Sequence, residues 1–330
     1  MTTQSESPSP APSPSPATPP VVDKRPPPDA PLTSPFSGGG LVDVFQRRYL
    51  LKLLVQKELT SRYQGSVLGL LWSYVLPLVR FSMYFFVIGL ILGLHADLPN
   101  FAIHLFCALV GVHFFTETFS AGTRAIVKNK ALVRKMAMPR EMFPVATVIV
   151  SAVNTFPQVL ILFIASIAVG WRPDTQGVFA LVLGFAIITV LGTALALLFS
   201  AMNVFFKDFQ NIVATFMLFT HWIVPMMYPF SRLATSSMGD TWFYYVYLSN
   251  PLTIAVILIQ RGVWIPTFPD CSATVTTYCL PGGDPSAIGY PDLPHHLYLL
   301  GWIMLVASFI ILVLCQRAFS RLEGKFAERL

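Results

Sequence analysis

Charged residues are scarce in this chain, at 12% of its 330 residues, whereas soluble globular proteins carry about 25%. Hydrophobic residues make up 54%, and the mean hydropathy is +0.63. This balance excludes a water-soluble globule and predicts an integral membrane protein. The net charge of +6 does not indicate nucleic-acid binding, because the basic residues lie beside apolar runs rather than on a soluble domain.

Several catalytic motifs are absent from the sequence. It has no G-x-x-x-x-G-K-[ST] loop, so the chain carries no phosphate-cradling site for hydrolysing nucleotide by itself. The H-E-x-x-H, C-x-x-C and G-x-S-x-G patterns are missing too, so we predict no catalytic residue and no metal ligand. A self-contained enzyme is therefore disfavoured.

Acidic residues are rare within the apolar runs, where Glu117 is the one clear case. Proton-coupled carriers usually need intramembrane carboxylates or histidines, so this scarcity disfavours an ion-gradient mechanism. His104, His113 and His221 are candidates for such a role. Packing is the commoner role of a lone histidine on an apolar helix.

Residues 1–40 differ in composition from the rest of the chain, because they hold twelve of its 27 prolines together with many Ser, Thr and Ala. This composition predicts a disordered Pro-rich cytoplasmic tail. No apolar core of signal-peptide length follows its few charges, so we do not expect a secretory signal.

Long apolar runs dominate the remainder. A helix that rises 1.5 Å per residue needs about 20 apolar residues to cross a hydrocarbon core of about 30 Å. Six stretches qualify and predict an all-α, six-span transmembrane domain over residues 65–316: 66–94, 101–122, 142–170, 178–205, 209–229 and 293–315.

Lys and Arg gather before the first span, between the second and third, between the fourth and fifth, and after the sixth. The positive-inside rule then predicts a multi-pass protein with both termini in the cytoplasm, including a C-terminal tail at 317–330. Residues 41–64 have helical periodicity interrupted by charges, which predicts an amphipathic helix along the inner leaflet. A simple charged approach to the first span is the alternative.

Residues 125–141 combine basic side chains with Leu132, Met136 and Met138, as a short amphipathic cytoplasmic helix would. Pro139 is expected to stop this helix and Pro144 to open the next span. We interpret the segment as a handle that a cytoplasmic partner can push.

Arg80 lies midway along the first predicted span, where a charge costs at least about 2.5–3.5 kcal/mol, so it should face protein or water. Ser66, Ser73 and Tyr84 recur on about the same helical face. This polar stripe either lines a pathway for an anionic or hydroxyl-rich substrate or lets Arg80 pair with Glu117 inside the bundle. Nearby aromatic residues suit the stacking of sugar rings, with packing as the alternative.

The outer segment, residues 230–293, contains two short apolar stretches, 240–247 and 251–264, that are broken by Asn250 and Pro251. We expect a re-entrant pair of helices there. Cys271 and Cys279 follow in a non-cytoplasmic loop where a disulfide could persist, and two free thiols are the alternative.

Six segments between about residues 41 and 330 form a specific pattern when they are taken together, because they occur in a fixed order and at matching spacing. They are KELTSRYQGSVLGLLWSYVLPL at 57–78, the set Asn129, Leu132, Lys135, Met138, Pro139, Arg140, Glu141 and Pro144, NVFFKDFQNI at 203–212, PMMYPFS at 225–231, SNPLT at 249–253 and GKFAERL at 324–330. Together they resemble the membrane subunit, or permease, of polysaccharide-exporting ATP-binding-cassette (ABC) transporters of the type 2 class. Lys207 stands where that family usually has Arg.

The resemblance implies a homodimer in the bacterial inner (plasma) membrane that works with two copies of a separate cytoplasmic ATPase. ATP and Mg²⁺ would be bound by that partner, and no cofactor is expected in this chain. The implied cargo is a lipid-linked polysaccharide, such as O-antigen or a teichoic-acid-like polymer. The Pro-rich tail and cysteine-bearing loop are more similar to actinobacterial exporters of cell-wall galactan.

The resemblance also implies residue roles. ATPase coupling is expected at Lys128, Asn129, Leu132, Arg134, Lys135, Pro139, Arg140 and Glu141. The substrate path is expected at Trp72, Tyr74, Arg80, Phe81 and Tyr84. The outer gate is expected at Arg232, Tyr244, Asn250, Pro251 and Arg261, with the two arginines of that set as candidate pyrophosphate contacts.

Two other functions remain open from the sequence. One is an ion-gradient-driven carrier or flippase for a lipid-linked glycan that uses Glu117 and the histidines. The other is a membrane-embedded glycan ligase or glycosyltransferase that uses the outer loop.

Overall fold

The computed structural model describes residues 40–93, 98–135, 138–234, 241–267, 293–294 and 296–329. Each regular element within these ranges is a helix. The predicted tail, apart from Gly40, lies outside the described residues, and so do Met136 and the predicted disulfide of Cys271 and Cys279.

The predicted interface segment forms two helices, α1 (Gly40–Gln46) and α2 (Arg48–Tyr63), which are separated at Arg47. Helix α2 buries Leu51, Leu54 and Glu58. Their spacing of three and four residues places them on one helical face. That face packs on α7 (Met142–Ala168).

Five helical segments of the described chain are long and apolar enough to cross a membrane. They are α3 (Trp72–Tyr84) continued by the π-helical η2 (Phe85–Ile91), α5 (Phe101–Lys128), α7, α8 (Thr175–Phe205) and α13 (Leu297–Glu323). A sixth crossing exists if α11 (Trp242–Leu248) and α12 (Pro251–Val263) form one span, although they are bent by 73°. Short 3-10 turns precede α3 at η1 (Gly69–Leu71) and follow α12 at η3 (Ile265–Thr267).

The predicted fifth span, 209–229, is shorter than expected. Its helix, α9 (Phe209–Ile223), has 15 residues, which is a rise of about 22 Å at 1.5 Å per residue. Pro225 and Pro229 follow in irregular chain, because proline cannot donate the backbone hydrogen bond that would continue the helix. The apolar run was therefore longer than the helix it encodes.

Helices α5, α8 and α12 form the centre of the bundle. Within the most apolar part of α5, 78% of the residues are buried, and each residue from Leu252 to Val263 is buried. Small residues allow these helices to approach closely. A Cβ atom on Gly122 of α5 would lie 2.3 Å from the Ala196 side chain of α8, and one on Gly184 of α8 would lie 2.7 Å from the Ala255 carbonyl oxygen of α12.

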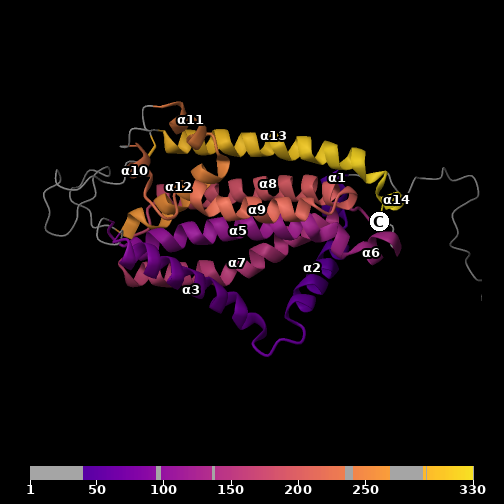
Figure 1. The fold of residues 1–330 in the computed structure, drawn as a ribbon, viewed down its shortest axis with the longest axis horizontal. Helices are drawn as coiled ribbons and strands as arrows, with labels where there is room; N and C mark the ends of the chain where they lie inside the picture. The colour runs from indigo at the N-terminus through magenta and orange to yellow at the C-terminus, as the bar shows by residue number, and fades with distance from the viewer. Residues whose placement is uncertain are drawn as a thin grey trace, which may run out of the picture. The chain divides into compact units, whose positions relative to one another are not determined.

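The long helices alternate in direction, so that α1, α2, α6 (Lys130–Lys135) and α14 (Phe326–Arg329) gather at one end, opposite α10 (Phe230–Ala234) and α12 (Figure 1). We call the end that carries α2, α6 and α14 the basic end. The helices at the basic end share an apolar core of their own, which is separate from the main core of the bundle. Its members include Val44, Ala125, Met142, Leu197 and Phe319. The basic segments predicted to share one side of a membrane therefore meet at one end of the bundle.

Candidate functional site

A cleft of about 510 Å³ opens at the basic end between α2, α5 and α7, and Gln210 of α9 also lines it. We call it the α2–α5 cleft. Its charged lining consists of Glu58 and Arg62 from α2 and of Glu117, Arg124 and Lys128 from α5. A charged cavity of this kind is unusual beside apolar spans, and it is the strongest candidate site of the described chain.

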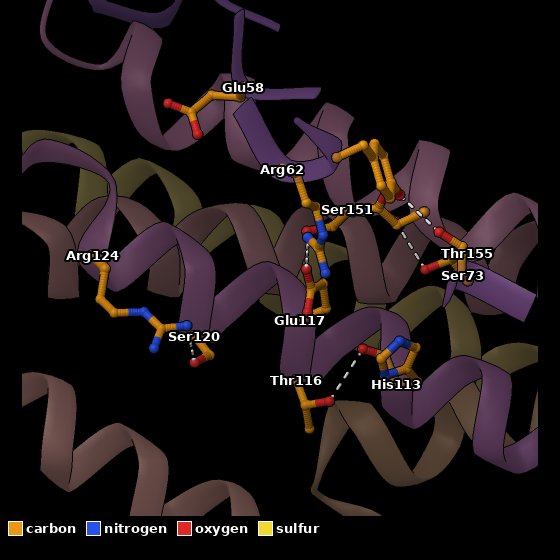
Figure 2. A network of polar contacts seen from close by, with 12 residues as sticks. Glu58, Arg62, Ser73, His113, Thr116, Glu117, Ser120, Arg124, Ser151 and Thr155 are labelled. Atoms are coloured by element: carbon orange, nitrogen blue, oxygen red, sulfur yellow. Dashed lines mark hydrogen bonds and ion pairs between the residues drawn. The ribbon is translucent and has the colours of Figure 1, made fainter. Parts of the chain in front are cut away.

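Arg62 donates a hydrogen bond to Glu117, which joins the end of α2 to the middle of α5 (Figure 2). The alternative prediction, in which Arg80 pairs with Glu117, is therefore wrong. Arg80 Nη1 instead lies 3.2 Å from His113 Nδ1. The carboxylate on which the carrier hypothesis depends is therefore already bound to an arginine of α2.

Glu58 connects α2 to the end of α5. Its carboxylate accepts hydrogen bonds from Lys128 Nζ at 2.5 Å and from Lys57 Nζ at 3.0 Å. Burial opposes the charged form, but the hydrogen bonds from Lys128, Lys57 and Asn129 outweigh it and lower the pKa of Glu58. Lys57 also donates to the Asn129 side chain, so the first residue after α5 is bound to α2 as well.

Tyr63, the last residue of α2, joins three helices through one hydroxyl group. It donates to Asn154 Oδ1 of α7 at 2.7 Å, and its oxygen lies 2.7 Å from Ser73 Oγ of α3. Because a tyrosine has one hydroxyl proton, Tyr63 accepts the second bond from Ser73. Ser73, predicted to belong to a polar stripe on the first span, therefore helps to fix α2.

The predicted coupling segment divides into an exposed part and a buried part. Arg134 and Lys135 at the end of α6 are exposed, and so is Lys130 at its start. Lys128 is exposed but bound to Glu58, and Leu132 is half-buried. The remaining predicted coupling residues are buried: Asn129, Pro139, Arg140 and Glu141.

Arg140 and Glu141 contact the C-terminal part of the same chain. Arg140 donates to the Glu323 carbonyl oxygen, its Nε lies 3.9 Å from the Glu323 carboxylate, and its guanidinium lies 5.5 Å from the centre of the Phe326 ring. Glu141 Oε1 accepts a hydrogen bond of 3.0 Å from Gln316 Nε2. This differs from the single exposed handle predicted from sequence, because four of the eight residues are buried and two of these, Arg140 and Glu141, contact α13 and α14.

The predicted path residues on α3 also face different surroundings. Trp72 is 42% exposed and Arg80 is exposed, whereas Phe81 packs on Phe106 and Tyr84 stacks on His221. Tyr74 is half-buried. Trp72 and Arg80 are thus the members of this set most open to a partner, a lipid or a substrate.

Two of the predicted gate residues, Asn250 and Pro251, lie at the bend between α11 and α12, whereas Arg261 lies in the last turn of α12. Asn250 Oδ1 accepts a hydrogen bond from the Leu252 backbone N–H, which caps α12, and Pro251 starts the helix. Arg261 is buried and donates to both carboxylate oxygens of Asp174, at 3.2 and 2.8 Å. Tyr244 packs near Phe230, and Arg232 is exposed. Since Asp174 compensates its charge, Arg261 is a poor candidate for a pyrophosphate contact.

Sequence reasoning did not assign Glu58, Arg62 or Asn154 to a site. Glu117 was singled out from the sequence, but with Arg80 as its possible partner; Glu58, a carboxylate among apolar and basic residues, could have been recognised in the same way as a position that needs a basic partner. The identity of each partner depends on tertiary packing. Arg62 lies 55 residues before Glu117, and Lys128 lies 70 residues after Glu58.

The helical architecture and the charged basic end define a multi-span membrane protein. Residues 49–263 match the model of the ABC-2 type transporter family, and the chain belongs to that family. It is similar to the O-antigen export system permease protein RfbA of Myxococcus xanthus, with 28% identity over 59% of this chain and 74% of that protein.

Two proteins of Klebsiella pneumoniae, also called O-antigen export system permease protein RfbA, are similar as well. One is 24% identical over 84% of this chain and 94% of its own length. The other is 25% identical over 66% of this chain and 80% of its own length. The chain is therefore the membrane subunit of an ABC transporter, as the sequence resemblance predicted.

Proposed function

We propose that this chain is the transmembrane subunit of an exporter that moves a lipid-linked polysaccharide from the cytoplasm across the bacterial inner membrane. Hydrolysis of ATP, with its Mg²⁺, in a separate subunit drives the transport. The observation that carries the proposal is family membership over residues 49–263, together with relatives named as O-antigen export permeases. Cell-wall galactan is the proposed cargo, with an O-antigen or teichoic-acid-like polymer next in order.

The basic end faces the cytoplasm in this proposal. Positively charged residues are retained on the cytoplasmic side of membrane proteins, and those of α2, α6 and α14 lie at this end. Both termini of the chain are then cytoplasmic. The bend between α11 and α12 lies on the outer side, where it acts as the gate.

The ATPase contacts the exposed residues Lys130, Arg134 and Lys135. Helix α6 follows directly on α5, whose 28 residues extend about 42 Å through the bundle. A push on α6 therefore reaches the centre of the transmembrane domain. The bonds of Lys128 to Glu58 and of Arg140 to Glu323 carry the same movement to α2 and α13.

Two copies of the chain form the passage, because one bundle of closely packed helices leaves little room for a glycan. Only 17% of the most apolar part of α3 and its π-helical continuation is buried within one chain. Trp72 and Arg80, which are exposed there, are therefore available to a second copy or to the substrate. Closed twofold symmetry is the common arrangement of such pairs.

Co-purification tests this proposal. The double variant Arg134→Glu and Lys135→Glu should lose the co-purifying ATPase while its thermal unfolding midpoint stays unchanged. The matched control, Arg317→Glu with Arg321→Glu, reverses two exposed charges at the same end and should keep the ATPase. Depletion of the chain should also cause a lipid-linked polymer to accumulate in the cytoplasmic leaflet.

Two results would contradict the proposal in different ways. Transport that survives deletion of the ATPase but stops when the ion gradient is dissipated would support a carrier. Glycan transfer by the purified chain alone would support a ligase.

A further inference from the structure

We infer that residues 324–329, which we call the C-terminal segment, position the coupling helix α6, and that Phe326 is the residue on which this positioning depends. The inference rests on the proposed function for the role of α6 as the ATPase contact. It adds a role for the end of the chain, which is to keep the link between α6 and α7 in one shape while α6 is pushed.

The C-terminal segment is ordered by its contacts rather than by its own length. Helix α13 ends at Glu323, with Gly324 as its C-cap, and the Lys325 backbone N–H donates to the Leu322 carbonyl oxygen. The helix that follows, α14, has 4 residues, whereas an isolated helix shorter than about 12–15 residues is only marginally stable in water. Phe326, the first residue of α14, is fully buried. The burial of this one ring therefore holds α14 against the bundle.

The Phe326 ring contacts three separate parts of the chain. Its centre lies 5.6 Å from that of Phe319 in α13 and 5.9 Å from that of Phe205 at the end of α8, and both pairs meet edge to face. The guanidinium of Arg140, just before α7, lies over the ring at 5.5 Å from its centre. Phe326 thus connects α13, α8 and the chain that leads into α7.

The link between α6 and α7 is bound to the same end of the chain by polar contacts. Arg140 donates to the Glu323 carbonyl oxygen, and the next residue, Glu141, accepts a hydrogen bond of 3.0 Å from Gln316 of α13. Hydrogen bonds and cation–π contacts fix orientation as well as distance. Buried ionic contacts often add little to stability compared with apolar packing, so this arrangement is better suited to fixing a position than to stabilising the fold.

Helix α6 rests on the apolar core that Phe326 helps to form. Val133 of α6 is a buried member of that core, and Leu132 packs against it. Arg134 and Lys135, which follow in α6, are exposed. Loss of the Phe326 ring would leave a cavity beneath Arg140 and in the core that supports α6. The exposed residues that contact the ATPase would remain, but their position relative to α7 would be less well defined.

This arrangement separates binding of the ATPase from use of its work. Capture of the ATPase depends on the exposed side chains of α6, which the C-terminal segment does not supply. Transmission of a push from α6 to α7 depends on the shape of the link that Arg140 and Glu141 hold. Without Phe326, ATP hydrolysis should continue while less of it moves polymer.

The test uses the full-length chain with its co-purified ATPase in membrane vesicles, and it measures polymer transported per ATP hydrolysed. Phe326→Ala should keep normal ATPase capture but lower this ratio by about fivefold, as expected for loss of coupling between sites. The matched control Lys325→Ala changes the exposed neighbouring residue and should keep the ratio of the wild type. Phe326→Leu retains an apolar side chain without an aromatic face for Arg140, so its ratio should fall less. The leucine variant also serves if the alanine variant does not fold.

A second measurement needs only this chain. Hydrogen exchange of backbone amides in Phe326→Ala should speed up about tenfold in α6 and remain at the wild-type rate in the middle of α8, since local opening is independent of global unfolding. A purely structural role would speed up exchange in both helices and lower ATP hydrolysis and transport together, leaving their ratio unchanged.

The outcomes separate this inference from the proposed function. A wild-type ratio together with wild-type exchange in α6, in both Phe326 variants, would overturn the inference while normal ATPase capture left the proposed function intact. Failure of the wild-type chain to capture any ATPase would contradict the proposed function instead, and the exchange of α6 would still show whether Phe326 positions that helix.

Discussion

Arg134 and Arg140 lie six residues apart in one basic segment, yet their surroundings differ completely. Arg134 is exposed at the end of α6, whereas the Arg140 side chain is 7% exposed and contacts Glu323 and Phe326. Basic residues that are close in the sequence therefore need not belong to one exposed surface. Part of it binds the chain to itself, and part remains available to a partner.

The same distinction holds elsewhere in the described chain. The buried Arg261 forms an ion pair with Asp174, whereas the exposed Arg124 has no carboxylate partner among the described residues. Burying an unpaired charge is costly, so a buried arginine indicates an internal partner. An open and uncompensated arginine is the kind that can meet an external anion or protein.

The largest predicted effect is the reversal of charge at Arg140. Arg140→Glu would place a third carboxylate beside Glu141 and Glu323 and should lower the free energy of unfolding by about 3 kcal/mol or more. Thermal unfolding of the purified chain in detergent measures this loss. Arg134→Glu should change the stability by less than about 0.5 kcal/mol. Equal thermal unfolding midpoints for the two variants would contradict the distinction between the buried Arg140 and the exposed Arg134.

A smaller effect is predicted for the pair at the opposite end. Arg261→Gln should destabilise the chain by about 1.5 kcal/mol, since its two charge-assisted hydrogen bonds to the partly exposed Asp174 are lost. The double-mutant cycle with Asp174→Asn measures the coupling in the same unfolding assay. Strictly additive effects of the two changes would show that the pair does not stabilise the fold.

The smallest effect is the pH dependence of α2 docking. The pKa of Glu58 is lowered from its ordinary value of 4.5 in the folded chain, so its stabilisation is present above that value and is lost as the pH falls through the folded pKa. A pair of fluorophores on α2 and α5 should report separation as the pH falls below about 4.5.

Lys128→Gln should move this separation to higher pH, because the loss of the Lys128 hydrogen bond raises the folded pKa of Glu58. Lys52→Gln on the exposed side of α2 serves as the control. If the midpoint pH of the separation is the same in Lys128→Gln and in the control, the protonation of Glu58 does not cause the separation.

The sequence predicted the helices better than their contacts. Apolar length located α5, α7, α8 and α13, because each must satisfy its backbone hydrogen bonds internally whatever surrounds it. The same criterion overestimated α9, where Pro225 and Pro229 end the helix inside an apolar run. Hydropathy measures the preference for lipid and says little about where a helix stops.

The candidate site was predicted in part. The exposed Arg134 and Lys135 were identified from charge and period, whereas the burial of Arg140 depends on Glu323, 183 residues away. The α2–α5 cleft depends equally on long-range partners such as Arg62 and Glu117. Pairings of this kind follow from how helices pack and leave no local pattern in the sequence.

The most direct test of the account is a photo-crosslinker placed at Lys135 of the full-length chain in its native membrane. The account predicts capture of a protein that carries a G-x-x-x-x-G-K-[ST] loop and hydrolyses ATP, with no such capture when the crosslinker is placed at Arg317. If Lys135 never captures an ATP-hydrolysing protein, or if Arg317 alone does, the proposed coupling through α6 is contradicted.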